Sequence, residues 1–350
     1  MDTTKNLLAL DEAIDAFAKK ELISGALRVT VKGTTVYEKR MGYANTDTKA
    51  PLTERSMFTI YSMSKPFCAI GLLRLLDEGK IDLQAHPSRY LPEARFFHPS
   101  VTLTHLLTHT SGVPDFMQTK AFFESHAPAS SAEDMRALLP ELAEYPNLFE
   151  PGTQGMYANI NFTLAALIIE NVSGMPYGDY MKKRVFEPLS MPYAVVDREG
   201  YECEQRAMGH ALQYGRSIPT ERSIAYMLGG GDILATVDDV YALNRAVKQK
   251  LLLKEQTWEM ALTPSPINSM GMGCTVSMGK SAQARIIHNG GHVGFRTLHT
   301  HHIAEDFDVI LLANCAHTCV RDVLYDLCVR HLLNENGVPL DTSGMDKGYI

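Results

Sequence analysis

Residues 57–79 read MFTIYSMSKPFCAIGLLRLLDEG and contain the local change of structure that decides the fold. The β-branched and aromatic residues of 57–61 are typical of a strand. Apolar residues then recur every three to four positions from Phe67 to Leu76, which predicts a helix. Pro66 is tolerated in a first helical turn, and Gly79 is typical of a helix end. The sequence therefore predicts that a strand gives way to a helix around Ser62.

Ser62 and Lys65 form an S-x-x-K pattern, which places a hydroxyl and an amine one helical turn apart on one face. The pattern is not specific by itself, because it recurs at Ser277 and Lys280. Ser62 precedes a predicted helix, whose N–H groups and positive end can stabilise an oxyanion. Ser277 instead lies in a predicted strand that runs into a turn. We therefore predict that Ser62 is the functional serine of the two.

Working outward from this segment, the flanking patterns predict one α+β (α/β) unit interrupted by helices. The segment 25–45 indicates a β-hairpin, and the last hundred residues contain short strands followed by a helix over 320–333. Between them, helical patterns dominate, as in 131–144, 161–173 and 236–251. We expect residues 1–79 and 262–350 to form a sheet domain and residues 80–261 a mostly helical domain. The active site is expected in the cleft between them.

The composition of the 350-residue chain excludes several classes of function. It has 33 basic and 40 acidic side chains, a net charge of −7 and 45% hydrophobic residues, as in soluble globular proteins. Neither a strongly basic region nor an apolar run of membrane-spanning length occurs, so we expect no nucleic-acid or membrane partner. The N-terminal MDTTKNLLALDEAIDAFAKK resembles an amphipathic helix rather than a secretory signal, which predicts a cytoplasmic location.

Neither the cysteines nor the histidines of the sequence indicate a metal site. The six cysteines form no C-x-x-C pair, so we expect free thiols, with Cys68 in the core. His299 and His301 share one face of a predicted strand and His302 takes the other, with no third ligand identified. We interpret these histidines as solvated hairpin residues and expect no metal and no cofactor.

Two further groups of residues could contribute to a site. Tyr157 and Asn159 form a Y-x-N tripeptide in a loop that opens onto a predicted helix, so the phenol can project into a cleft. The same tripeptide begins at Tyr43 and Tyr145, where we interpret it as structural. His288 ends a predicted strand and is followed by Gly290 and Gly291, glycines that allow a substrate or another backbone to approach closely.

Taken in order, these segments resemble the serine β-lactamase and penicillin-binding protein superfamily. The similarity is greatest to the branch with class C β-lactamases, family VIII carboxylesterases and D-amino-acid peptidases. It spans roughly residues 5–335 and rests on segments 57–93, 101–114, 149–161, 183–191, 229–240 and 286–298. The resemblance implies a β-lactamase/transpeptidase-like fold, in which N- and C-terminal helices flank an antiparallel sheet.

The resemblance also implies a role for each site residue. Ser62 would be the nucleophile, and Lys65 and Tyr157 would share the work of general base, provided that both of their pKa values fall below the usual ones. Which of them takes the first proton is left open. The backbone N–H groups of Ser62 and Gly291 would form the oxyanion hole. Asn159 would orient Lys65 and hold a substrate carbonyl.

The segment that begins at His288 departs from the family pattern. Class C β-lactamases usually have Lys-Thr-Gly at this place, whereas this chain has His288-Asn289-Gly290. A histidine supplies at most a partial cation at neutral pH, so we expect weak β-lactamase activity at most. The leading hypothesis is a serine hydrolase that cleaves a small ester or amide through an acyl-enzyme on Ser62. The alternatives are an acyltransferase that uses the same acyl-enzyme, and a catalytically idle scaffold. The natural substrate, its acyl-chain length and the oligomeric state are not predicted.

Overall fold

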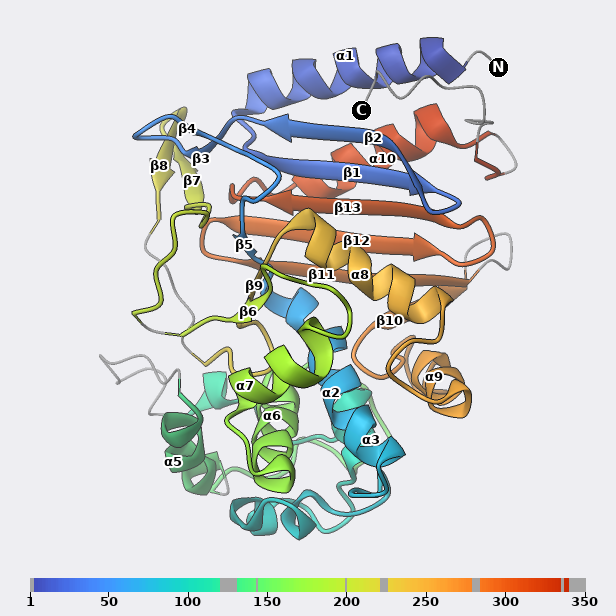
Figure 1. The fold of residues 1–350 in the computed structure, drawn as a ribbon. Helices are drawn as coiled ribbons and strands as arrows, with labels where there is room; N and C mark the ends of the chain where they lie inside the picture. Colours follow the sequence, from blue (N-terminus) through green and yellow to red (C-terminus); the bar gives the residue numbers. More distant parts are fainter. Residues whose placement is uncertain are drawn as a thin grey trace.

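The computed structural model describes residues 3–119, 131–142, 144–198, 200–220, 226–278, 284–334 and 337–339. Its centre is an antiparallel sheet with the strand order β10-β11-β12-β13-β1-β2 (Figure 1). The strands are β1 Gly25–Val31, β2 Thr34–Met41, β10 Thr275–Met278, β11 Ala284–His292, β12 Phe295–His302 and β13 Phe307–Ala313. The pairing of β1 with β13 joins the two ends of the chain, as the sequence predicts.

Helices cover both faces of this sheet. α1 (Thr3–Glu21) and α10 (Val320–Leu332) pack against each other on one face, and α8 (Val237–Lys248) crosses β1 and β13 on the other (Figure 1). α8 begins with a capping box in which the side chains of Thr236 and Asp239 bond each other's backbone N–H groups. Apolar residues of the strands, such as Val29 and Leu311, are fully buried beneath the helices.

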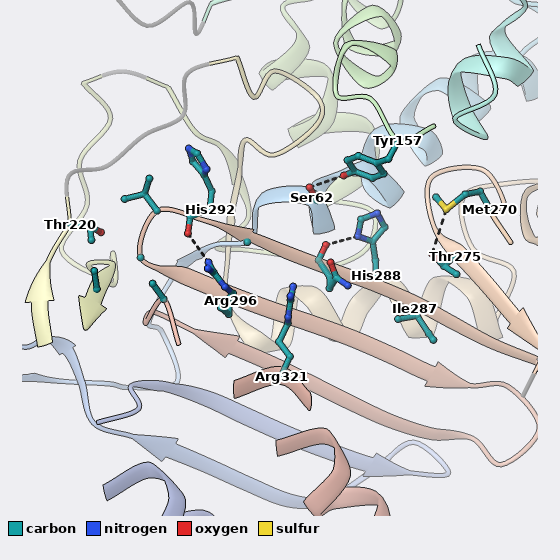
Figure 2. A pocket seen from close by; sticks show the side chains of 16 residues that line it. Ser62, Tyr157, Thr220, Met270, Thr275, Ile287, His288, His292, Arg296 and Arg321 are labelled. Atoms are coloured by element: carbon teal, nitrogen blue, oxygen red, sulfur yellow. Dashed lines mark hydrogen bonds between the residues drawn. The ribbon is translucent and has the colours of Figure 1, made fainter. Parts of the chain in front are cut away.

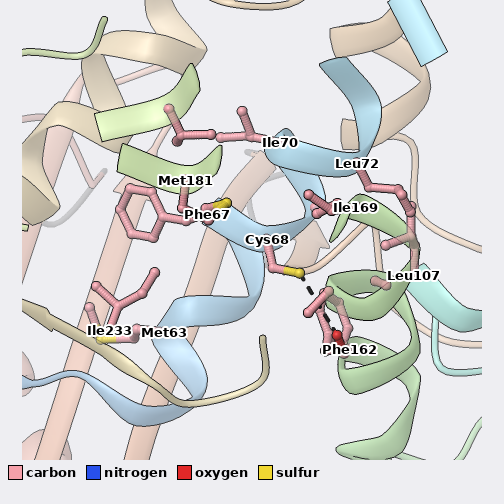
Figure 3. Packing of buried hydrophobic residues seen from close by; sticks show 14 of the residues in the cluster. Met63, Phe67, Cys68, Ile70, Leu72, Leu107, Phe162, Ile169, Met181 and Ile233 are labelled. Atoms are coloured by element: carbon pink, nitrogen blue, oxygen red, sulfur yellow. Dashed lines mark hydrogen bonds between the residues drawn. The ribbon is translucent and has the colours of Figure 1, made fainter. Parts of the chain in front are cut away.

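The remaining helices form a second layer beside the β11 edge of the sheet (Figure 1). They are α2 Lys65–Asp77, α3 Leu103–Leu107, α5 Ala132–Leu142, α6 Ile160–Ser173, α7 Tyr177–Met181, the π-helical η5 Lys182–Phe186 and α9 Glu255–Leu262, with short 3₁₀ turns at Pro87–Arg89, Pro92–Phe96 and Phe116–Gln118. α2 and α6 lie at the centre, and most of their residues are buried. Figure 3 shows Cys68 of α2 facing Phe162 of α6, and the ring of Phe67 packs edge-on against that of Phe186 in η5. Cys68 is fully buried, as predicted.

Smaller sheets lie outside the central one. One consists of β5 Phe58–Thr59, β9 Ile233–Ala235 and β6 Val195–Val196; the others are the pairs β3 Tyr43–Asn45 with β4 Ala50–Pro51 and β7 His210–Gln213 with β8 Arg216–Pro219. The pairing of β5 with β9 matters most for the site, because it holds the chain segment before Ser62 against the segment after Gly231.

The strand expected over 57–61 is shorter than predicted. β5 ends at Thr59, and a 3₁₀ turn (η1, Tyr61–Ser64) precedes α2, which begins at Lys65. The break occurs at Tyr61, whose φ of 45° lies in the left-handed region. Its ring packs edge-on against His292 and Phe295, and such contacts can maintain an unfavourable backbone conformation. Ser62 therefore lies in a tight turn rather than in the first turn of the α-helix.

The interpretation of the three β12 histidines as solvated residues is wrong. His299, His301 and His302 are buried because β12 is an inner strand covered on both faces. Their polar atoms contact Asn244, Asp308 and Tyr325, respectively. His301, Asp306 and Asp308 bring possible ligand atoms within 4.8 Å of one another, but the Lys248 ammonium already lies 2.5 Å from Asp306.

The observed architecture confirms the predicted fold class: an antiparallel sheet with terminal helices and a helical region between its two halves. The division at residues 79 and 262 stays a prediction. α8 belongs to the range 80–261 by sequence but packs on the sheet. All six cysteines are free thiols. None of the helices in the described part of the chain is both long and apolar enough to cross a membrane.

Candidate active site

A cavity of about 880 Å³ lies between the β11–β12 edge of the sheet and the turn that carries Ser62. Figure 2 shows Ser62 and Tyr157 on one side of it and His288 of β11 facing them. Arg296 and Arg321 extend into the same space from β12 and α10. The cavity thus brings together residues from both ends and the middle of the chain.

Ser62 and Lys65 meet as the S-x-x-K spacing predicts. The Nζ atom of Lys65 lies 3.2 Å from Ser62 Oγ, 3.0 Å from Asn159 Oδ1 and 2.6 Å from the Gly230 carbonyl oxygen. The oxygens of Asn159 and Gly230 can only accept, so Lys65 donates a hydrogen to each. A neutral amine has two hydrogens and one lone pair, and the lone pair is then left for the Ser62 hydroxyl.

The surroundings of Lys65 favour the neutral amine. The side chain is fully buried, and burial lowers its pKa from 10.5 to about 7. The carboxylates of Asp115 and Asp232 oppose this shift by electrostatic attraction. Burial raises the pKa of both carboxyl groups, and that of Asp232 reaches about 7. Their negative charge near neutral pH is therefore reduced, and so is their attraction for the Lys65 ammonium. At pH 7 a large fraction of Lys65 is therefore uncharged.

The surroundings of Tyr157 do not favour the phenolate expected to act as a base. Its ring lies at the cavity surface, 48% exposed, while its hydroxyl turns inward and donates to Ser62 Oγ at 2.8 Å. Loss of water around that hydroxyl raises the pKa of Tyr157 above its usual 10, although the bond to Ser62 works against the rise. The expected fall in this pKa is wrong, and Tyr157 holds its proton at neutral pH.

His288 lies in the cavity wall but carries no charge there. It is buried, and burial together with the nearby Lys65 lowers its pKa to about 3. Its Nδ1 atom lies 2.8 Å from the Asn289 carbonyl oxygen, which can only accept, so Nδ1 carries the hydrogen and Nε2 is an acceptor. His288 therefore supplies no cation at neutral pH, within the expected limit of at most a partial one.

The two glycines after His288 differ in their surroundings. A Cβ atom on Gly290 would lie 2.2 Å from the Ile60 carbonyl oxygen, so only glycine lets β11 approach the segment before Ser62 this closely. A Cβ atom on Gly291 would lie 3.3 Å from the Arg296 side chain and 3.5 Å from the Phe295 carbonyl oxygen. Gly291 lines the cavity together with Ser62, and its part in the oxyanion hole stays a prediction.

Several residues around the site were not predicted. Asp115 accepts the backbone N–H of Asn159 at 2.5 Å, and Asp232 accepts that of Gly229 at 2.8 Å. Gly230, which lies in the family-like segment 229–240, accepts a hydrogen bond from Lys65 through its carbonyl oxygen. Asp115 follows a family-like segment directly and could have been found there. Arg296 and Arg321 have no local signal, because only the sheet and α10 bring them to the cavity.

The described residues of the repeated motifs do not line the cavity. Ser277 is in β10, and Lys280 is outside the described residues. Tyr43 is in β3, Tyr145 lies between α5 and α6, and neither lines the cavity. Two of the candidate pairs lie in one site: Ser62 with Lys65, and Tyr157 with Asn159.

Comparisons with known proteins agree with this geometry. The chain is 28% identical to penicillin-binding protein 4* of Bacillus subtilis, over 87% of this chain and 71% of that protein. It is 27% identical to the esterase EstB of Burkholderia gladioli, over 71% of each chain. The crystal structure of a penicillin-binding protein from Bacillus halodurans superposes with a TM-score of 0.79 at 24% identity, covering 92% of this chain and 97% of that one. The model of the Beta-lactamase family matches residues 10–324, and the chain therefore belongs to the β-lactamase family.

Proposed function

We propose that this protein is a serine hydrolase that cleaves small esters or amides through an acyl-enzyme on Ser62. One observation carries the proposal: a continuous path of hydrogen bonds in which the Tyr157 hydroxyl donates to Ser62 Oγ, and the Ser62 hydroxyl faces the lone pair of Lys65. A serine needs a base within hydrogen-bonding distance to become a nucleophile. Lys65 fits that role because its pKa of about 7 leaves a large fraction of the amine neutral at pH 7.

In acylation, Ser62 Oγ attacks the carbonyl carbon while its proton moves to Lys65 Nζ. The backbone N–H groups of Ser62 and Gly291 stabilise the oxyanion that forms. When the bond to the leaving group breaks, Tyr157 gives its proton to the departing oxygen or nitrogen, and the Lys65 ammonium restores the phenol. The raised pKa of Tyr157 suits it to this acid role rather than to first base.

In deacylation, water occupies the place of the leaving group beside Tyr157. Its proton passes through the Tyr157 hydroxyl to Lys65, its oxygen attacks the acyl carbon, and Lys65 returns the proton to Ser62 Oγ as the acid leaves. Lys65 and Tyr157 thus end the cycle in the protonation states in which they began it.

The cavity also favours a substrate with an anionic group. Burial lowers the pKa of Arg321, and repulsion from the nearby Arg296 guanidinium lowers it further. Arg296 Nη1 donates to the carbonyl oxygens of His292 and Phe295, and Arg321 Nη1 to that of Gly290. Neither guanidinium forms a salt bridge within the described residues. The remaining N–H groups can bind a carboxylate, which His288 cannot attract.

The test uses p-nitrophenyl acyl esters of different chain lengths, nitrocefin and a fluorophosphonate probe, with Ser62→Ala as the control. We expect ester turnover, weak or absent nitrocefin turnover, and probe labelling that Ser62→Ala abolishes. A wild-type protein that neither turns over an ester nor reacts with the probe would contradict the proposal, as would equal labelling of the variant.

A further inference from the structure

His109 contacts three consecutive residues around Tyr157. Its carbonyl oxygen accepts the Met156 N–H at 2.9 Å, and its Nδ1 atom lies 3.2 Å from the Ala158 nitrogen. Between these two contacts, the imidazole stacks on the Tyr157 phenol, with ring centroids 4.3 Å apart and planes at 29°. His109 thus contacts the loop just before and just after Tyr157, as well as the phenol ring itself.

These contacts require an uncharged imidazole. A backbone N–H can only donate, so Nδ1 of His109 must be the acceptor and hydrogen must reside on Nε2. The amide of Asn161, 3.1 Å away, donates to the same atom and in turn accepts the Ser111 hydroxyl. Burial and the charge of Lys65 lower the pKa of His109 well below 6.5, in agreement with this geometry.

The backbone of His109 is also specialised. Its φ of 55° lies in the left-handed region, which most side chains avoid and which asparagine tolerates better than bulky residues. This conformation follows the end of α3 at Leu107 and directs the ring toward Tyr157 rather than into the helix. A local constraint beside a reacting group is typical of a functional position.

We propose that His109 is the positioning residue for Tyr157, holding the phenol so that its proton reaches the leaving group. The proposal rests on the proposed function, since it needs Tyr157 to act as the acid. His109 is not itself among the residues that line the cavity, and it reaches the site through its contact with Tyr157. Its effect on the reaction passes through the orientation of one hydroxyl.

Two substitutions separate the contacts of His109. His109→Asn retains an acceptor near the Nδ1 position and tolerates the backbone but loses the stacked ring. His109→Phe retains a ring and loses the acceptor for Ala158. We expect kcat to fall about 10-fold for Asn and about 100-fold for Phe, with KM within about threefold, because small misplacements of a reacting group cost rates of this order. His98→Asn, on a histidine that pairs with Glu150, is the matched control.

The decisive readout compares the loss of kcat/KM, which reports the steps up to acylation, for two esters of one acid, with p-nitrophenol or an aliphatic alcohol as the leaving group. Nitrophenolate departs without a proton, whereas an alkoxide needs one. The proposal predicts a loss at least tenfold larger for the alkyl ester. It also predicts that either His109 substitution adds less than about twofold to the loss caused by Tyr157→Phe, because a residue acting through that hydroxyl has nothing left to position.

Equal losses for the two esters, full additivity with Tyr157→Phe, or unchanged kcat in both folded variants would overturn the proposal. If His109→Phe fails to fold, as thermal unfolding will show, His109→Asn decides the outcome alone. Fluorophosphonate labelling of wild-type Ser62 keeps the two proposals distinct. Labelled Ser62 with no effect of His109 contradicts only the positioning role, whereas absence of both labelling and ester turnover in the wild type contradicts the hydrolase itself.

Discussion

The Nζ atom of Lys65 lies 3.2 Å from the Oγ atom of Ser62, and its two other hydrogen-bonding contacts are both with acceptors. This arrangement fixes the direction of proton transfer. An ammonium would direct a third hydrogen at Ser62 and could not take its proton, whereas the neutral amine can. Activity should therefore depend on the charge of Lys65.

The first prediction concerns pH. Burial lowers the pKa of Lys65 to about 7, so kcat/KM should rise with pH as the ammonium loses its proton and reach half its plateau near pH 7. The raised pKa of Tyr157 predicts no loss of activity from its ionisation up to about pH 10. A pH profile of kcat/KM for a neutral ester measures both limits. A plateau that extends unchanged from pH 8 to pH 5 would show that Lys65 is not the base.

The second prediction concerns Asp232, which is buried and whose Oδ1 atom has no hydrogen-bond partner among the described residues. In Asp232→Asn, the amide oxygen can still accept the Gly229 N–H, but the negative charge is lost. The Lys65 ammonium then loses an attractive charge, so the pKa of Lys65 falls further. The acidic limb of the kcat/KM pH profile should therefore move to lower pH by roughly half to one unit. The exposed Asp82→Asn is the control. A shift to higher pH would contradict the electrostatic account.

The third prediction concerns the glycines of β11. Gly290→Ala should lower the free energy of unfolding by about 1–3 kcal/mol and reduce kcat, because its Cβ overlaps the Ile60 carbonyl oxygen and displaces the turn that carries Ser62. Gly291→Ala should cost much less stability, because its Cβ comes closest to a flexible arginine side chain at 3.3 Å and lies at ordinary contact distance from the Phe295 carbonyl oxygen. Chemical denaturation of both variants measures the difference. Similar stabilities would show that β11 does not need this close approach.

The fourth prediction concerns the arginines of the cavity. Arg321→Gln and Arg296→Gln should each raise KM about tenfold for an ester with a carboxylate in its leaving group, since a charge-assisted hydrogen bond is lost. KM for the uncharged isostere should remain within about twofold. Equal effects on the two substrates would argue for a steric role of the arginines instead of a charge-specific one.

Local patterns in the sequence predicted the elements and the central residues of the site. Ser62, Lys65 and Asn159 could be found because one helical turn and one loop determine their chemistry. The pKa values could not be predicted in the same way, since they depend on burial by distant segments: spacing alone cannot show that the Tyr157 hydroxyl is desolvated or that His288 is neutral. The burial of His299, His301 and His302 likewise follows from the position of β12 inside the sheet, which the periodicity of a single strand does not reveal.

The most direct test of the central claim is a rapid-quench measurement of the acyl-enzyme by mass spectrometry. A p-nitrophenyl ester is mixed with the protein at several pH values, the reaction is stopped within milliseconds to seconds, and digested peptides are analysed. The account predicts an adduct with the mass of the acyl group on the peptide that contains Ser62, absent in Ser62→Ala, which forms faster as the pH rises through 7. An adduct on another residue, turnover without any adduct under conditions where deacylation is slow, or a rate of formation independent of pH would contradict it.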